Sequence, residues 1–159
     1  MRTLTVVPNG LDAIVEKYGE PYDPDFQRDH LRWYRAPFRM RLSWQPETSI
    51  GGFVCHHAIG LVVMDTLKEV LRFGGLAYLQ ENDLDLFGGC YNPRGKRGGK
   101  GTSTHAWGIA VDWCPALGPM GGPTRMPDFI VTAFESRGFT WGGRWARPDG
   151  MHFQAAEGY

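Results

Sequence analysis

The sequence predicts an α+β domain with a small, mostly antiparallel sheet flanked by helices. Three observations support this. A length of 159 residues suits one domain, and 42% hydrophobic residues supply enough apolar surface for a core. The segments described below occur in the order helix, strand, helix, strand, strand, helix, strand. Glycine and proline are spread along the chain and form no linker, so we expect a single domain over residues 1–159.

The first half of the chain predicts one clear helix. Leu11 to Tyr18 places apolar residues at i, i+3, i+4 and i+7, with Asn9 as a candidate cap and Gly19 as a stop. From Glu20 to Glu47 four prolines interrupt the chain, and hydrophobic alternation appears only over 38–42. We therefore expect irregular chain with one possible strand there.

A central helix is predicted over His57 to Phe73, because its apolar residues recur at helical spacing up to Gly74-Gly75. The loop from Arg94 to Gly101 is rich in glycine and basic residues. Two further strands are expected at Leu84–Phe87 and Trp107–Trp113. A helix ended by Gly138 is expected over Pro127–Arg137, and a last strand over Met151–Gln154.

The charge balance excludes several classes of partner. Seventeen basic and 17 acidic residues give a formal net charge of +0, so no global field attracts nucleic acid or anionic lipid. No stretch approaches the ~20 apolar residues of a membrane helix, and the N-terminus lacks the features of a signal peptide. Three cysteines without paired spacing are typical of reduced thiols. We expect a soluble monomer, made in the cytoplasm and without a membrane anchor.

The residues that point to chemistry lie between positions 103 and 154. His105 before a strand and Asp112 near its end can turn toward one face and reach one metal ion. A catalytic zinc takes three protein ligands and keeps a fourth position for water, so a third ligand is required. His152, flanked by the apolar Met151 and Phe153, is the best candidate.

Other readings of these residue types remain open. A histidine taken alone is more often a hydrogen-bonded core or surface residue, and Asp112 could cap a turn. His56 and His57 are a rival ligand source, but neighbours at the start of a helix should point in different directions. His30 lacks a carboxylate at a useful spacing. Cys114 as a fourth zinc ligand would close the position that catalysis needs.

A resemblance then adds to these patterns. The string Ser103-x-His105-x-x-Gly108-x-Ala110-x-Asp112, followed by Asp149-x-x-His152, resembles the signature of zinc peptidases that cut peptidoglycan stem peptides. These are D-alanyl-D-alanine carboxypeptidases, D,D-dipeptidases and the L-alanyl-D-glutamate peptidases of phage endolysins. The resemblance extends from about Gly88 to Gln154. It implies a compact α+β fold shared with the hedgehog signalling domain, with one Zn²⁺ on His105, Asp112 and His152.

Asp149 is our candidate for the general base and acid. The resemblance and physical reasoning agree here, because an acidic side chain three residues before a zinc ligand can reach the attacking water and later the leaving amine. Many relatives carry Glu at this position, which is longer by one methylene. The alternative is a turn aspartate after Pro148.

Basic and hydroxyl residues complete the candidate site. Arg94 resembles the family arginine upstream of the first ligand, where a guanidinium would offset negative charge on the scissile carbonyl oxygen. Arg97 is the second candidate, and a solvated loop arginine is the alternative for both. Ser103 resembles the family serine that contacts substrate, although a capping role fits equally. Trp107 and Trp113 should belong to the core, and the roles of Trp141 and Trp145 stay open.

The resemblance implies a zinc metallopeptidase that hydrolyses a peptide bond in peptidoglycan stem peptides. Our first expectation is an L-alanyl-D-glutamate endopeptidase of the phage or prophage endolysin type, which acts on the cell wall after release from the cytoplasm. A D-alanyl-D-alanine carboxypeptidase is the alternative within this class. An alternative of another class is a non-catalytic binding or phage structural module held by zinc, against which Asp149 argues because a structural site needs no base.

Overall fold

The computed structural model describes residues 1–159 and confirms the predicted α+β class. Six strands form one sheet in the order β2-β1-β3-β4-β6-β5, and every neighbouring pair is antiparallel except β1 with β3. The strands are β1 (Leu31–Leu42), β2 (Gln45–His56), β3 (Leu86–Gly89), β4 (Ala110–Trp113), β5 (Thr140–Trp141) and β6 (His152–Gln154).

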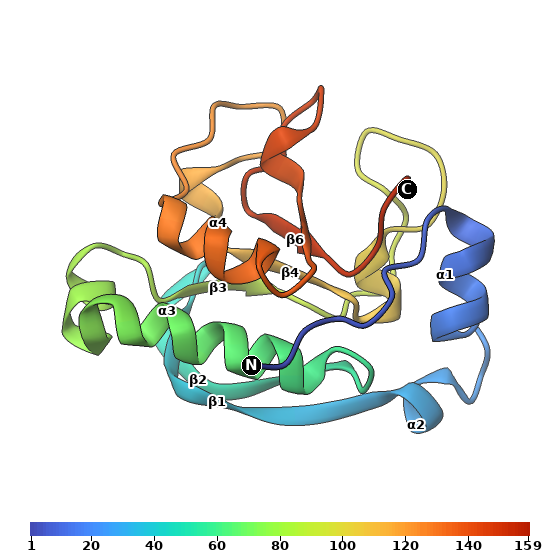
Figure 1. The fold of residues 1–159 in the computed structure, drawn as a ribbon, viewed down its shortest axis with the longest axis horizontal. Helices are drawn as coiled ribbons and strands as arrows, with labels where there is room; N and C mark the ends of the chain where they lie inside the picture. Colours follow the sequence, from blue (N-terminus) through green and yellow to red (C-terminus); the bar gives the residue numbers. More distant parts are fainter.

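Helices cover one face of this sheet (Figure 1). The α-helices are α1 (Leu11–Tyr18), α2 (Phe26–His30), α3 (Gly60–Glu81) and α4 (Asp128–Glu135). Helices α3 and α4 pack against each other, and Phe134 of α4 stacks on Phe153 of β6 with ring centroids 4.1 Å apart. Because strand side chains alternate, the neighbours of Phe153 in β6 point to the opposite face. That face carries the candidate site.

The expectation of irregular chain between Glu20 and Glu47 is wrong. This stretch contains α2, all of β1 and the start of β2, which together form a long antiparallel hairpin. Pro37 is tolerated within β1 because the pairing register shifts between Arg35 and Met40, where the missing N–H breaks no ladder bond. Pro46 lies in β2, an edge strand with one side unpaired.

The first helix matches its predicted bounds, but its start differs from expectation. Gly10 precedes α1 without a side-chain cap, and Asn9 instead pairs with Glu157, so the proposed Asn9 cap is wrong. Helix α3 begins at Gly60 and continues past the predicted stop. At Gly75 its backbone takes φ 80°, which glycine adopts without strain, and a second helical segment follows the kink.

The later elements occur in the predicted order, most of them with shorter bounds, and the strand predicted at Leu84–Phe87 is β3, shifted by two residues. The predicted strand over Trp107–Trp113 is only β4, and His105 lies before it in η1, a 3-10 helix over Thr104–Trp107. Two further 3-10 turns are η2 (Pro115–Leu117) and η3 (Gly142–Arg144). Helix α4 ends near Gly138, whose φ of 93° fits the predicted stop.

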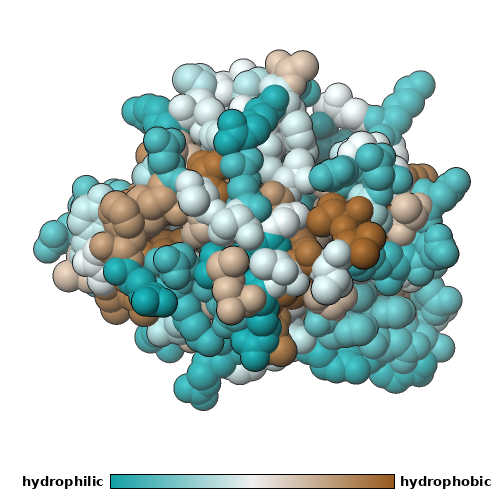
Figure 2. Space-filling view, in the orientation of Figure 1, coloured by the Kyte–Doolittle hydropathy of each residue, from teal (hydrophilic) through white to brown (hydrophobic).

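The core is one cluster of 34 buried residues that includes Trp107 and Trp113, as predicted. All three cysteines are free and buried. No helix is long and apolar enough to cross a membrane. On the face shown in Figure 2, hydrophilic residues surround separate apolar patches.

Candidate metal centre

Two strands bring Asp112 and His152 together. Asp112 of β4 pairs directly with His152 of the antiparallel strand β6, so both side chains extend from the same face of the sheet. The buried Val111 and Phe153, which also pair, point to the helix-covered face and anchor the two strands. Apolar residues on one face therefore fix the polar pair on the other.

His105 reaches the same point from η1. Ser103 caps this turn, since its hydroxyl oxygen accepts a hydrogen bond from the His105 backbone N–H at 3.3 Å. Gly108 ends the turn in the left-handed region with φ 67°. The ring is buried, and its Nδ1 donates to the carbonyl oxygen of Cys90 at 2.6 Å. Nε2 is therefore the unprotonated nitrogen of the neutral ring.

Three metal-binding atoms converge here. Asp112 Oδ1 lies 3.2 Å from His105 Nε2 and 3.1 Å from His152 Nδ1. The other nitrogen of His152, Nε2, donates to Gln154 Oε1 at 3.0 Å, which leaves Nδ1 as the acceptor. His105 Nε2 is buried without a hydrogen-bond partner. Lone pairs that face one another in this way need positive charge between them, either protons or a metal ion, and the residue types fit a bound zinc ion.

The electrostatics of the group agree with this reading. Burial raises the pKa of Asp112, but its close contacts with His105 and His152 outweigh burial and hold the pKa well below its usual range. Burial lowers the pKa of His152, whereas the hydrogen bond and charge of Asp112 raise it, and the net direction is upward. In the metal-free group a proton on Nδ1 of His152 therefore faces Asp112, and a metal ion would replace it. The carboxylate is thus fully ionised, as a metal ligand must be.

Asp149 lies beside this group without contacting it through a hydrogen bond. Its side chain is 6% exposed, and Oδ1 has no hydrogen-bond partner. Burial raises the pKa of Asp149 most, His152 lowers it, and the charge of Asp112 raises it again, with a net upward shift. A carboxylate with a raised pKa and a free oxygen can both accept and return a proton.

A cavity of about 230 Å³ connects these residues with the basic loop. Its cationic lining consists of Arg94, Lys96, Arg97 and Arg147. Arg94 Nε is buried without a partner, and burial followed by the like charge of Arg97 lowers the pKa of this guanidinium. Ser103 also lines the cavity, so its hydroxyl combines the capping position with access to a ligand.

The tryptophans left open by the sequence divide between two environments. Trp145 lines the cavity, with its ring centroid 5.5 Å from that of His152. Trp141 packs on Phe153 and donates to the carbonyl oxygen of Gly150 at 2.9 Å, which is a structural position. Cys114 is buried outside the metal group, and burial raises the pKa of its thiol to about 12.

Sequence reasoning missed the groups that orient the two histidines. Gln154 fixes the tautomer of His152, and its own amide nitrogen donates to Ala156 O at 3.1 Å. Thr104 Oγ1 donates to the same Gln154 oxygen at 3.0 Å. The i, i+2 spacing of His152 and Gln154 on one strand face was a usable signal for Gln154. The Cys90 carbonyl gave none, because a backbone atom carries no residue pattern.

The expectation that His56 and His57 diverge is also wrong. His56 ends β2 and His57 begins the turn that follows, and with His30 they form a second group whose ligand atoms lie within 4.8 Å of one another. This group contains no carboxylate.

Comparison with known proteins agrees with the site geometry. Residues 97–155 match a family model described as D-alanyl-D-alanine carboxypeptidase. The matched segment contains His105, Asp112, Asp149 and His152, while Arg94 lies just before it. No curated protein and no solved structure gives a significant match.

Proposed function

We propose that this protein is a peptidoglycan-acting metallopeptidase, and specifically an endopeptidase that cleaves stem peptides between L-alanine and D-glutamate. The match of residues 97–155 to a D-alanyl-D-alanine carboxypeptidase family model supports the peptidase class. One observation carries the catalytic part of this proposal. Three ligand atoms lie within 4.8 Å of one another, and Asp149, whose buried Oδ1 has no hydrogen-bond partner, lines the same cavity as His105 and His152.

His105, Asp112 and His152 would hold the zinc ion, which when bound supplies Lewis-acid polarisation of a carbonyl and of water. Asp149 then takes the proton of the attacking water and delivers it to the leaving amine. Arg94 offsets the negative charge that develops on the carbonyl oxygen, because its buried Nε–H is free to donate. Cys90 and Gln154 keep the two histidines in their ligand tautomers.

The cationic lining supports the endopeptidase over the carboxypeptidase. Four basic side chains face the cavity, which is more positive charge than one terminal carboxylate requires. An L-alanyl-D-glutamate bond places the free carboxylate of D-glutamate next to the scissile bond, and further carboxylates follow along the stem. The charge of the cavity therefore suits a substrate that carries several carboxylates.

A D-alanyl-D-alanine carboxypeptidase is the second candidate, and Arg94 is the observation in its favour. The half-buried guanidinium of Arg94, whose Nε–H has no partner, can bind one terminal carboxylate. A structural zinc module is disfavoured, since burying an unpartnered Asp149 lowers stability and has no benefit without a reaction.

Mass spectrometry of purified sacculi digested with the zinc-loaded protein distinguishes these functions. The proposed activity releases stem peptides with D-glutamate at their new N-terminus. Loss of a single terminal alanine would instead identify a carboxypeptidase. Unchanged sacculi, together with unchanged synthetic stem peptides, would contradict both and favour the structural module.

A further inference from the structure

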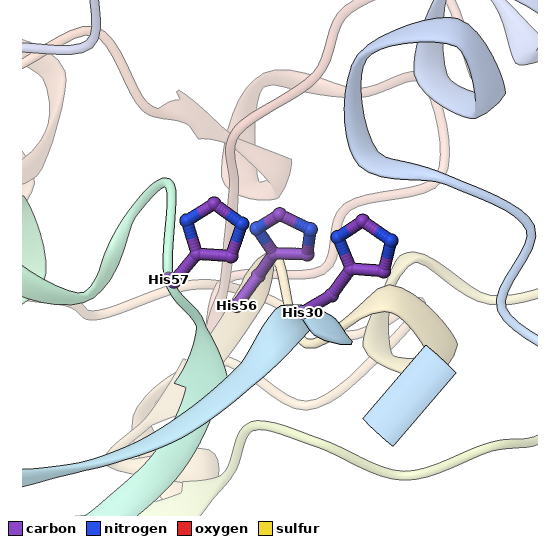
Figure 3. Close-up of side chains that lie close together, drawn as sticks. All are labelled: His30, His56 and His57. Atoms are coloured by element: carbon purple, nitrogen blue, oxygen red, sulfur yellow. The ribbon is translucent and has the colours of Figure 1, made fainter. Parts of the chain in front are cut away.

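All five histidines of the sequence lie in one of two groups that can hold a metal ion. The group outside the peptidase site consists of His30 at the end of α2, His56 at the end of β2, and His57. Figure 3 shows the three rings side by side and pointing the same way. Their centroids are separated by 4.7, 5.2 and 5.9 Å. Each ring offers one nitrogen, and these ligand atoms lie within 4.8 Å of one another, which is close enough for them to share one ion.

Backbone pairing holds the three histidines in this arrangement. Leu31, which follows His30, pairs with His56 across the β1–β2 ladder, and the backbone N–H of His57 donates to His30 O at 2.8 Å. The cluster therefore does not depend on flexible loops. A preformed ligand set reduces the entropy lost on binding.

His56 has the hydrogen bonding of a metal ligand. The ring is buried, and its Nε2 donates to the carbonyl oxygen of Tyr18 at 3.0 Å, which leaves the lone pair on Nδ1. The present neighbour of Nδ1 is the backbone N–H of Ala58 at 3.1 Å. Burial lowers the pKa of His56 to about 4, so the ring is neutral near pH 7, as metal binding requires.

His30 and His57 supply the free nitrogens and the access. His30 Nδ1 is buried without a hydrogen-bond partner, which is the state of a donor atom that lacks its ligand. His57 is exposed, so an ion from solvent can reach the group. Burial, with the nearby positive charges of His30 and Arg32, lowers the pKa of His57.

Negative charge surrounds the cluster on the side of His30. A cavity of about 200 Å³ beside this ring is lined by Glu20, Asp23, Asp25 and Asp29. Arg28 forms ion pairs with Asp25 and Asp29, but no ion pair involves Glu20 or Asp23. The remaining charge attracts cations and provides carboxylates close to the histidines.

We propose that His30, His56 and His57 bind a second divalent transition-metal ion of the class that prefers imidazole ligands, with Zn²⁺ as the representative. Water or a carboxylate completes the coordination, and Nδ1 of His56 exchanges its contact with Ala58 for the ion. This site is independent of the peptidase reaction. It fastens the start of β1 to the end of β2, and the backbone N–H of His56 donates to Gly108 O at 2.9 Å, next to the turn that carries His105. The ion would therefore stabilise the frame of the peptidase site.

The test is zinc stoichiometry of the full chain, measured by elemental analysis after dialysis against micromolar free Zn²⁺ near pH 7. The proposal expects two zinc ions per chain for the wild type and one for His57→Ala, whose exposed side chain can be removed without a cavity. His30→Gln should give the same loss. Glu47→Gln, an exposed change on β2 away from the histidines, should keep both ions.

A second readout separates this site from the catalytic one. Zinc should raise the melting temperature of His57→Ala less than that of the wild type, while the rate of peptidoglycan digestion stays the same. A wild type that saturates with a single zinc, lost on His105→Ala but kept in His57→Ala, would overturn the proposal. Two ions retained in both His57→Ala and His30→Gln would overturn it as well.

Discussion

The two histidine groups of this protein use similar donor atoms in different surroundings. In the peptidase site, the Asp112 carboxylate lies between two buried histidines, and each histidine is oriented by a separate acceptor, Cys90 O or Gln154 Oε1. In the second group, three near-parallel imidazoles lie at the end of the hairpin where β1 begins and β2 ends. The first group opens on a cavity that contains Asp149, whereas the second borders acidic side chains.

This difference shows what separates a catalytic site from a metal-binding one. Ligand type alone does not distinguish them, because imidazole serves both. The proposed catalytic group adds a buried acid with an unpartnered oxygen and a cationic wall, both of which are costly to fold and fit a reaction on a charged substrate. The second group adds only charge that attracts cations.

Removing a ligand of the peptidase site should have the largest effect. His105→Ala, Asp112→Ala and His152→Ala should each lose the zinc of this site and reduce digestion of sacculi to the rate of metal-free protein, because two remaining ligands hold a catalytic zinc poorly. His57→Ala is the matched control and should keep full activity. Normal zinc content and activity in all three ligand variants would show that the assigned group is not the metal site.

Gln154→Ala should have an intermediate effect. Without Gln154 Oε1, the Nε2 proton of His152 loses its acceptor at 3.0 Å, and the ring is no longer fixed with Nδ1 toward Asp112. Loss of such a supporting contact typically lowers metal affinity by ~10–100-fold. Competition with a zinc chelator measures this change, and exposed Gln80→Ala serves as the control. Equal affinities in both variants would mean that Gln154 does not orient His152.

Acid should destabilise the metal-free protein through His56 of the second group, and this effect should be smaller than those of the variants above. The pKa of His56 is about 4 in the folded protein, against an ordinary value of 6.5 in the unfolded chain. Between pH 4 and 6.5 the unfolded chain therefore binds more protons than the folded protein. The free energy of unfolding of metal-free protein should therefore fall as the pH drops from 6.5 to 4, by about 3 kcal/mol at most from this group. The dependence, measured by urea denaturation, should be weaker in His56→Gln. It should also weaken in His57→Ala, because His57 lowers the pKa of His56 and its own pKa is lowered by burial. An equal slope in His56→Gln and wild type would contradict the role of burial.

The structure brings together the three metal ligands that the sequence proposed and confirms the fold class, but the sequence missed part of the sheet. His105, Asp112 and His152 could be found because their spacing matches a known pattern and because strand alternation places Asp112 and His152 on one face. The β1–β2 hairpin was missed, since Pro37 and Pro46 argued against strands. Only the three-dimensional structure shows that Pro37 lies at a register shift and Pro46 on an edge strand.

The second histidine group could not be predicted for a related reason. His30 and His56 are 26 positions apart in the sequence, and only the pairing of Leu31 with His56 brings them together. Without the hairpin, His56 and His57 look like neighbours at the start of a helix. Long-range pairing, rather than local spacing, decides such sites.

Asp149→Asn tests the central claim, that a buried carboxylate beside the zinc ligands performs the proton transfers. The change keeps the side-chain size and removes the proton acceptor, so turnover of sacculi should fall by ~10²–10⁴-fold. Zinc content should stay at the wild-type value, and the melting temperature should stay the same or rise, because burial disfavours the ionised Asp149. The exposed Asp128→Asn is the matched control and should remain active. Wild-type turnover in Asp149→Asn would contradict the mechanism, and loss of its zinc would show that Asp149 is a ligand instead.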